Sequence, residues 1–201
     1  YLIRYLRRVG LGVKDQNKMD KPLVPLSGGL SVMSGMFIGL STYIFIRTFF
    51  YNDDTLLLHF FAGITTILLI TFIGFMDDLI ILKSRESSAG LRQWQKPLLT
   101  LAAAVPLIAI NAGETTLSLP IIGWIDFGIL YPLLIVPIIV IIAANMVNLL
   151  AGFNGLEAGL GIIYIGMLGL YALYNQSYVA ATIALVTFGA LSTFMVFNWT
   201  P

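Results

Sequence analysis

Cysteine is absent from the 201 residues, and histidine occurs once, at His59. Within these residues there is therefore no disulfide framework, no thiolate metal site and no cluster of histidine ligands. Charge is also scarce: Asp, Glu, Lys and Arg make up 10% of the chain, against roughly 25% in an ordinary soluble domain. With a formal net charge of +1, no basic surface points to nucleic acid as a partner.

The chain is instead rich in apolar residues. They make up 58% of the chain and form long runs without a charged residue, and about 20 such residues let a helix cross a bilayer. We therefore predict an all-α fold, a polytopic transmembrane helical bundle. About six spans are expected, at residues 30–50, 55–76, 97–111, 129–147, 156–174 and 178–197. Residues 1–10 fit either the remnant of an earlier span or an amphipathic surface segment.

The third predicted span is short. Fifteen helical residues rise only about 22 Å, so this span needs a thinned bilayer or helical residues beyond these limits. Pro106 and Pro137 are expected to kink their helices, because each removes a backbone donor. Residues 113–123 are expected to form a short external hairpin or a loop that lies on the bilayer.

Residues 1–201 are expected to form a single integral membrane domain. The chain starts at Tyr1 without a methionine and stops at Pro201 directly after an apolar run. We interpret it as a fragment of a larger protein, truncated at both ends.

Lysine and arginine fall almost entirely on one side of this topology. Numbering the loops alternately places residues 1–29, 77–96, 148–155 and 198–201 together. This side carries ten of the eleven basic residues: Arg4, Arg7, Arg8, Lys14, Lys18, Lys21, Lys83, Arg85, Arg92 and Lys96. Because cytoplasmic loops carry the excess of lysine and arginine, we predict that this side is cytoplasmic.

The stretch from Asn145 to Gly159 carries amides, a carboxylate and glycines at the end of an apolar run. Unpartnered amides are costly in hydrocarbon, so this stretch indicates a polar site at the membrane border. Asn145 and Asn148 share a helix face, and amide and carboxylate oxygens with substrate phosphates are what Mg²⁺ prefers. Amides that join two helices are the alternative interpretation.

Asp77 and Asp78 end an apolar run on the same side. Neighbouring helical side chains point about 100° apart, so the two carboxylates are expected to have different partners, with Mg²⁺ or a lysine for one and a substrate for the other. Two solvated residues that end a span would look the same. Lys96 stands at the start of the third span, where a lysine suits phosphate.

Three polar clusters on one side could assemble a single site: residues 14–29, Asp77 and Asp78 with Lys96, and residues 145–157. Polar groups at mid-membrane depth would instead favour a secondary transporter. A membrane scaffold subunit that binds a partner through residues 83–96 is the third alternative.

Four motifs resemble those of the polyprenyl-phosphate N-acetylhexosamine-1-phosphate transferase family. In chain order they are residues 15–29 (DQNKMDKPLVPLSGG), 74–78 (GFMDD), 145–159 (NMVNLLAGFNGLEAG) and 197–201 (FNWTP). The third motif is most similar to the eukaryotic and archaeal dolichyl-phosphate branch. One departure is Ile81, where relatives carry a polar residue.

The resemblance implies the activity and the site. A polyprenyl or dolichyl phosphate attacks the β-phosphorus of a UDP-N-acetylhexosamine, expected to be UDP-GlcNAc, and UMP leaves, with Mg²⁺ as cofactor. The implied residues are Asp77, Asp78 and Lys96 as catalytic groups, Asn148 at the metal, Asn154 near the uracil, and Glu157, Lys18 and Asn145 at the substrate.

The resemblance also implies binding partners and a cellular location. The implied partners are the UDP-sugar, the lipid phosphate and membrane lipid, with a homodimer left open. The active site is expected on the cytoplasmic face of an archaeal or bacterial cell membrane, or of the endoplasmic reticulum. A family Phe-Pro-Gly-Asp segment with a further metal ligand would lie beyond Pro201, so the fragment alone is expected to be inactive.

Overall fold

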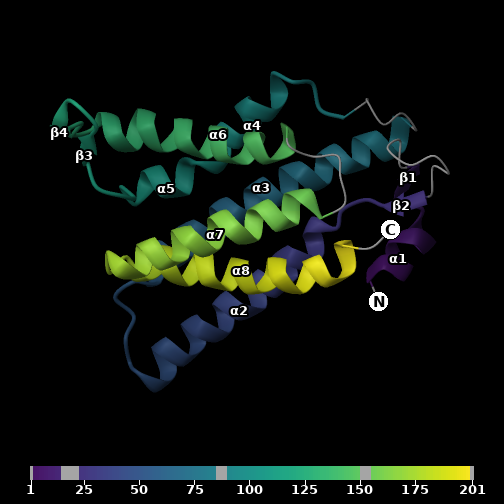
Figure 1. The fold of residues 1–201 in the computed structure, drawn as a ribbon, viewed down its shortest axis with the longest axis horizontal. Helices are drawn as coiled ribbons and strands as arrows, with labels where there is room; N and C mark the ends of the chain where they lie inside the picture. The colour runs from purple at the N-terminus through teal and green to yellow at the C-terminus, as the bar shows by residue number, and fades with distance from the viewer. Residues whose placement is uncertain (1, 15–22, 85–89, 150–154, 200–201) are drawn as a thin grey trace.

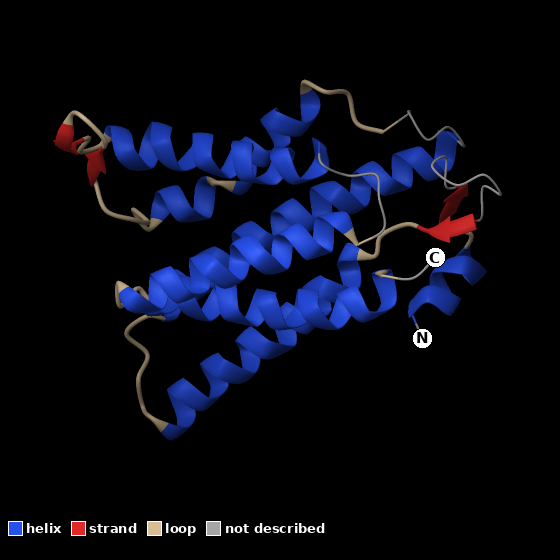
Figure 2. Cartoon of the chain, viewed as in Figure 1, coloured by secondary structure: helices blue, strands red, loops and turns tan. Residues whose placement is uncertain are grey.

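The computed structural model describes residues 2–14, 23–84, 90–149 and 155–199 (Figure 1). Its helices are α1 (Leu2–Val9), α2 (Gly29–Phe50), α3 (Leu57–Ser84), α4 (Gln95–Ala103), α5 (Val105–Ala109), η1, a π-helix (Tyr131–Ile135), α6 (Val136–Leu149), α7 (Leu156–Tyr174) and α8 (Tyr178–Asn198). Two small antiparallel hairpins complete it (Figure 2): β1 (Gly12–Lys14) with β2 (Leu23–Pro25), and β3 (Thr116–Leu119) with β4 (Gly123–Asp126).

The predicted class, an all-helical membrane protein, is confirmed. Among the residues that the structure describes, four helices, α2, α3, α7 and α8, are long and apolar enough to cross a membrane. The other two predicted spans correspond to the shorter apolar segments Gln95–Ala109 and Tyr131–Val147. The total of six spans therefore stays a prediction. Within residues 1–10, Leu2–Val9 form α1, which ends before the β1–β2 hairpin.

Prolines mark the irregular points of the two short segments. The helical segment Gln95–Ala109 is interrupted at Ala104, whose N–H donates to Leu101 O at 3.1 Å in a tightened turn. Two residues later Pro106 cannot donate to the preceding turn, because it has no N–H. In the second segment the π-helix η1 contains Pro132 and ends two residues before Pro137, the second residue of α6. Each break lies beside a proline for which a kink was predicted.

Small residues let α8 approach its neighbours closely. A Cβ at Gly39 of α2 would lie 2.7 Å from Val186 Cγ1, and one at Gly166 of α7 would lie 3.1 Å from Phe188 Cδ2. Close backbone approach over small residues is the usual way in which membrane helices associate, because lipid gives apolar side chains no drive to leave it. Helices α2, α7 and α8 thus form one packed group.

The two short segments form a second packed group with α3. Its core is Ala104, Val136 and Val140, and Ile70 of α3 and Tyr131 of η1 pack against it. Helices α4 and α5 contact α3, and α6 packs on α4 and α5 (Figure 1). Helix α3 therefore lies between the two short segments and the α2–α7–α8 group.

Helix α3 corrects one predicted boundary. The span was expected to end at Met76, but the helix continues through Asp77 and Asp78 to Ser84. The 21 residues from Leu57 to Asp77 rise about 30 Å, which is the thickness of the hydrocarbon core. The two carboxylates therefore lie about one hydrocarbon thickness along the helix from its first residue. The helix continues beyond them, because helical backbone can leave the bilayer without losing its hydrogen bonds.

Helix ends from distant parts of the sequence meet at one end of the bundle. In Figure 1 the first residues of α2, α4 and α7 lie at the same end as the last residues of α3, α6 and α8. The β3–β4 hairpin and the α7–α8 turn lie at the opposite end. This alternation agrees with the predicted loop numbering, and the assignment of the first end to the cytoplasm stays a prediction.

At the opposite end, Asp53 closes the connection between α2 and α3. Its carboxylate accepts hydrogen bonds from Thr55 N at 3.1 Å, Thr55 Oγ1 at 2.7 Å and Arg47 Nε at 3.0 Å. The Thr55 hydroxyl, the Arg47 guanidinium and the Thr55 amide lower the pKa of Asp53 from 3.8 to about 2. The charged form is the one that these donors stabilise.

This lowered pKa predicts an acid-dependent contribution to stability. Because the folded pKa lies below the unfolded one, the stabilisation by Asp53 is fully present above pH 3.8 and is lost as the pH falls towards about 2. The difference in unfolding midpoint between the wild type and Asp53→Asn should therefore shrink over that interval. Asp54→Asn, a neighbouring carboxylate outside this network, is the control, and a difference that does not vary with pH would contradict the prediction.

Candidate functional site

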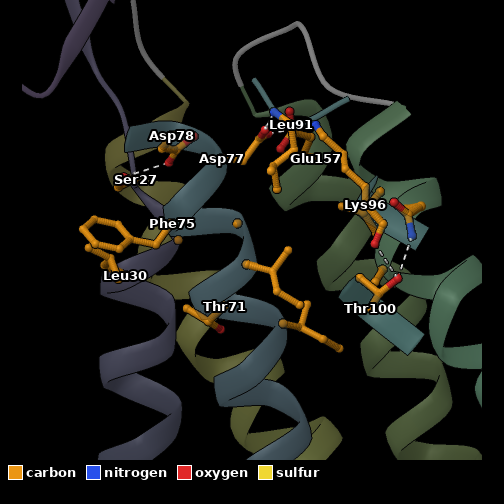
Figure 3. A pocket seen from close by; sticks show the side chains of 17 residues that line it. Ser27, Leu30, Thr71, Phe75, Asp77, Asp78, Leu91, Lys96, Thr100 and Glu157 are labelled. Atoms are coloured by element: carbon orange, nitrogen blue, oxygen red, sulfur yellow. Dashed lines mark hydrogen bonds and ion pairs between the residues drawn. The ribbon is translucent and has the colours of Figure 1, made fainter. Parts of the chain in front are cut away.

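A cavity of about 330 Å³ opens at the end of the bundle where the helix ends meet (Figure 3). Five of the predicted site residues line it: Asp77, Asp78, Lys96, Asn145 and Glu157. They come from α3, α4, α6 and α7, and α2 contributes to the wall as well. The expectation that clusters far apart in sequence could share one site is met for these five residues.

Asp77 is held by partners on both carboxylate oxygens. Lys96 Nζ donates to Oδ2 at 2.8 Å, and the N–H of Leu91 donates to Oδ1. The ion pair is largely shielded, with 15% of the Asp77 side chain and 24% of the Lys96 side chain exposed. Asp77 thereby fixes the residues before α4 and aims the lysine ammonium into the cavity.

Gly90 makes this arrangement possible. A Cβ at this position would collide with the Asp77 carboxylate. Only glycine lets the backbone come close enough for the following N–H to reach Asp77.

Asp78 faces the other way, as helical geometry predicts. It accepts a hydrogen bond from Ser27 Oγ at 2.7 Å, which joins α3 to the residue pair that precedes α2. Figure 3 shows Asp78 and Ser27 near Leu30 and Phe75, on the more apolar side of the cavity, whereas Asp77 lies towards Lys96 and Glu157. The two adjacent carboxylates therefore have different surroundings, one polar and one partly apolar.

Asn145 joins α6 to α4. Its Nδ2 donates to Thr100 Oγ1 at 3.2 Å and to Ile141 O at 2.8 Å, and Thr100 Oγ1 in turn donates towards Lys96 O at 3.0 Å. Both amide hydrogens are thus used within the protein, as in the alternative interpretation of amides that join helices. What Asn145 could offer a ligand in the cavity is its acceptor, Oδ1.

Glu157 lies in the first turn of α7 at the rim of the cavity. Gly155 precedes the helix with a φ of +75°, a left-handed conformation that glycine adopts without strain. A carboxylate near a helix N-terminus is favoured by the helix dipole. The chain can therefore turn back from α6 and present an acidic group to the same cavity.

Three predicted residues cannot be placed in this way. Lys18 and Asn154 lie outside the described residues. Asn148 belongs to the last turn of α6, and the structure describes its backbone but not its side chain. The roles expected for these three residues stay predictions.

Three residues of the site were not predicted from the sequence, namely Gly90, Leu91 and Thr100, and Ser27 was predicted only as a member of the cluster at residues 14–29. Ser27 has a φ of +62° beside a glycine pair, and a hydroxyl at such a turn is a signal that could have been used. Leu91 acts through its backbone N–H, which leaves no trace in the sequence. Thr100 lies in an apolar helix, where its hydroxyl usually bonds to the preceding turn.

The donor chemistry of the cavity suits Mg²⁺ in kind. Asp78, Glu157 and Asn145 line the same cavity, and carboxylate and amide oxygens are ligands that this ion prefers. Among the described residues, however, no three acidic or histidine side chains are grouped so that they could hold a metal. This part of the chain would therefore supply only part of a coordination shell, completed by phosphate, by water or by further residues.

Comparison with known proteins gives the family. The model of glycosyl transferase family 4 matches residues 60–201, which is more than half of the chain and includes most of the cavity. The chain belongs to this family. The predicted resemblance to polyprenyl-phosphate N-acetylhexosamine-1-phosphate transferases is thereby confirmed.

Relatives come from all three domains of life. A Saccharolobus solfataricus protein provisionally named UDP-N-acetylglucosamine–dolichyl-phosphate N-acetylglucosaminephosphotransferase is 34% identical over 203 residues, covering 100% of this chain and 58% of its own length. A Dictyostelium discoideum protein of that name is 27% identical, covering 79% of this chain and 39% of its own. A phospho-N-acetylmuramoyl-pentapeptide-transferase of Bacillus cytotoxicus is 30% identical, covering 99% and 62%. The chain thus spans about three fifths of the first relative.

The unequal partners of the two carboxylates predict unequal effects on stability. Asp77→Asn leaves Lys96 without its charge partner in a shielded site and should lower the free energy of unfolding by about 1–3 kcal/mol. Asp78→Asn keeps an oxygen that accepts from Ser27 and should cost less than about 1 kcal/mol. Unfolding in detergent measures both.

A double-mutant cycle of Asp77→Asn with Lys96→Met isolates the pair itself. The two changes should be less than additive, because the second removes the charge that the first leaves unpaired. Equal losses for Asp77→Asn and Asp78→Asn, or strict additivity in the cycle, would contradict the assignment.

Proposed function

We propose that this chain forms part of an enzyme that transfers N-acetylglucosamine-1-phosphate from UDP-N-acetylglucosamine to a polyprenyl phosphate of the dolichyl type and releases UMP. The observation that carries the proposal is the cavity itself. It brings together the Asp77–Asp78 pair, Lys96 and the first acidic residue of α7 at the membrane border, in a chain of glycosyl transferase family 4. The names of the archaeal and eukaryotic relatives support the choice of sugar and lipid.

The position of the cavity suits two substrates of opposite character. A polyprenyl phosphate stays in the bilayer, and its headgroup reaches only the border. A UDP-sugar is soluble and arrives from water. Figure 3 shows an apolar side at Leu30 and Phe75 and a polar side at Lys96 and Glu157, so we propose that the lipid phosphate enters beside the first pair and the nucleotide beside the second.

The reaction exchanges one phosphoanhydride bond for another. A phosphate oxygen of the lipid forms a bond to the β-phosphorus of the UDP-sugar, and the bond from that phosphorus to the oxygen of UMP breaks. The second pKa of a phosphate monoester is near 6, so the nucleophile is largely dianionic at neutral pH. Placement and charge neutralisation therefore matter more than a strong general base.

The described residues divide this work. Lys96, aimed by Asp77, supplies positive charge to a phosphate oxygen, and Asp77 is its positioning residue. Asp78 with Ser27 lines the side from which we propose that the lipid phosphate comes. In this proposal Asp78, rather than Asp77, touches the lipid phosphate.

Mg²⁺ is proposed as the cofactor. It would be held by oxygen atoms of the cavity together with Asn148, and when bound it would neutralise charge on the pyrophosphate. We further propose that the cavity faces the cytoplasm, because ten of the eleven basic residues belong to the loops that the sequence assigns to its end of the bundle.

Transfer of labelled GlcNAc-1-phosphate to dolichyl phosphate in membrane vesicles tests the proposal. The protein is a chimera in which the remaining segments of the Saccharolobus solfataricus relative surround these 201 residues. We expect labelled lipid with Mg²⁺ and none after chelation. Asp78→Ala, Lys96→Met and Asn148→Ala should each lower the rate by about 10²- to 10³-fold, as the loss of one preorganised charge or ligand does.

The matched control is Asp54→Asn, a carboxylate at the opposite end of the bundle, which should leave the rate unchanged. A correctly inserted chimera that makes no labelled lipid would overturn the proposal. Uptake of the intact UDP-sugar into vesicles without lipid product would instead favour the transporter alternative, and inactivity with retained partner binding would favour a scaffold.

The 201 residues by themselves should not catalyse transfer. The described residues supply only part of a metal site, and the chain spans about three fifths of its first relative. In the same vesicle assay the isolated chain should give no labelled lipid above background. Activity from the isolated chain would contradict this prediction and would place a complete site within these residues.

A further inference from the structure

The β3–β4 hairpin, at the opposite end from the cavity, changes in polarity from its base to its tip. The register pairs Thr116 with Asp126 at the base, where the Asp126 carboxylate accepts a hydrogen bond from Gly128 N at 2.9 Å. The tip is apolar: Ile121 is fully exposed, and Ile122 and Trp124 are 69% and 76% exposed. A soluble protein rarely presents such an apolar tip without a partner for it.

The backbone at the tip is held in an unfavourable conformation. Ile121 follows Pro120 in the turn and has a φ of +77°. A β-branched residue is a poor choice there, where glycine or asparagine would fit without strain. The side chain of Ile121 is fully exposed, so packing inside the protein does not offset this strain. An isoleucine at this position therefore indicates that the side chain contacts a partner outside the protein.

The surface beside the hairpin continues this apolar character. Ile129 and Leu130, which lead from β4 into η1, and Leu133 within η1 are all more than half exposed. On an all-helical membrane protein such a surface faces lipid. The apolar tip is therefore continuous with a lipid-facing surface rather than isolated in water.

The hairpin also joins the two segments that are short for a bilayer. Gln95–Ala109 rises about 22 Å, less than the roughly 30 Å of the hydrocarbon core. The bilayer is thicker than this segment is long, and exposed polar backbone cannot remain in hydrocarbon. The structure that follows the segment must therefore adapt its end to the bilayer. The hairpin is the connection that begins at that end.

We propose that the tip formed by Ile121, Ile122 and Trp124 inserts into the lipid interface of the leaflet opposite the cavity. Its partner is the bilayer itself, and the base with Thr116 and Asp126 stays at the aqueous surface. The tip then anchors the ends of the two short segments at a fixed depth. Since α4 and α6 carry Lys96 and Asn145 at their other ends, the anchor also sets the depth of that side of the cavity.

Depth-dependent quenching of Trp124 tests this inference in nanodiscs. The chain has three tryptophans, and Trp94→Phe with Trp199→Phe leaves Trp124 as the reporter. We expect blue-shifted emission, with a greater loss of intensity from lipids brominated high on the acyl chain than from lipids brominated near its end. Iodide in the water should quench weakly. Water-like emission that iodide quenches and brominated lipid does not would overturn the proposal.

The absence of cysteine allows a second measurement that does not depend on tryptophan. Ile122→Cys and Thr116→Cys each introduce a single thiol, one at the tip and one at the base of the same hairpin. In sealed membranes a water-soluble maleimide should label Thr116→Cys rapidly and Ile122→Cys many times more slowly. Equal labelling would contradict insertion, and protection of both together with crosslinks between copies would show that a second chain, not lipid, covers the hairpin.

Ile121→Asn separates apolar contact from turn geometry. Asparagine tolerates a positive φ, so the hairpin should keep its fold and lose only the side chain that enters lipid. The emission of Trp124 should shift to the red and its quenching by brominated lipid should fall. Unchanged quenching in this variant would show that the tip does not depend on its isoleucine for contact with the bilayer. Because the readouts are optical and chemical, they stand or fall independently of the transferase activity.

Discussion

The ion pair between Asp77 and Lys96 is the interaction on which the polar end of this protein depends. A carboxylate at the border of a bilayer is costly unless a partner neutralises it. Here the partner is a lysine 19 residues along the chain, and the Leu91 N–H takes the remaining oxygen. One interaction therefore offsets the cost of the charge, fixes the approach to α4 and places an ammonium group in the cavity.

The rest of the cavity follows from how the helices on either side are packed. Small residues draw α2, α7 and α8 together, while apolar side chains pack α4 and α5 against α3, and α6 packs on α4 and α5. Helix α3 lies between the two groups and carries adjacent carboxylates that point to both. Because residues one apart on a helix point about 100° apart, Asp78 can bond to Ser27 on one side while Asp77 bonds to Lys96 on the other.

Sequence reasoning could predict the features that depend on composition and periodicity. The lengths of the apolar runs predict the long helices, and the distribution of basic residues predicts that the polar clusters lie on one side of the membrane. Because charge is scarce, Asp77, Asp78 and Lys96 can be recognised as candidate site residues. Sequence reasoning failed for features that depend on the course of the backbone. The helix continues past Met76 because leaving the membrane does not require a helix to end, and Leu91 contributes only an N–H. The pairing of Asp77 with Lys96, and of Asp78 with Ser27, depends on helix rotation, which apolar side chains set over the whole length of α3.

The middle and the ends of each spanning helix meet different physical requirements. The middle of a spanning helix must satisfy every backbone group internally and expose apolar side chains to lipid, which leaves little room for reactive groups. Helix ends have free backbone donors, tolerate glycine and lie where water and lipid headgroups meet. An even number of crossings between clusters returns the chain to the same border, so residues as distant as Ser27 and Glu157 can share one cavity without any charge being placed at mid-membrane depth.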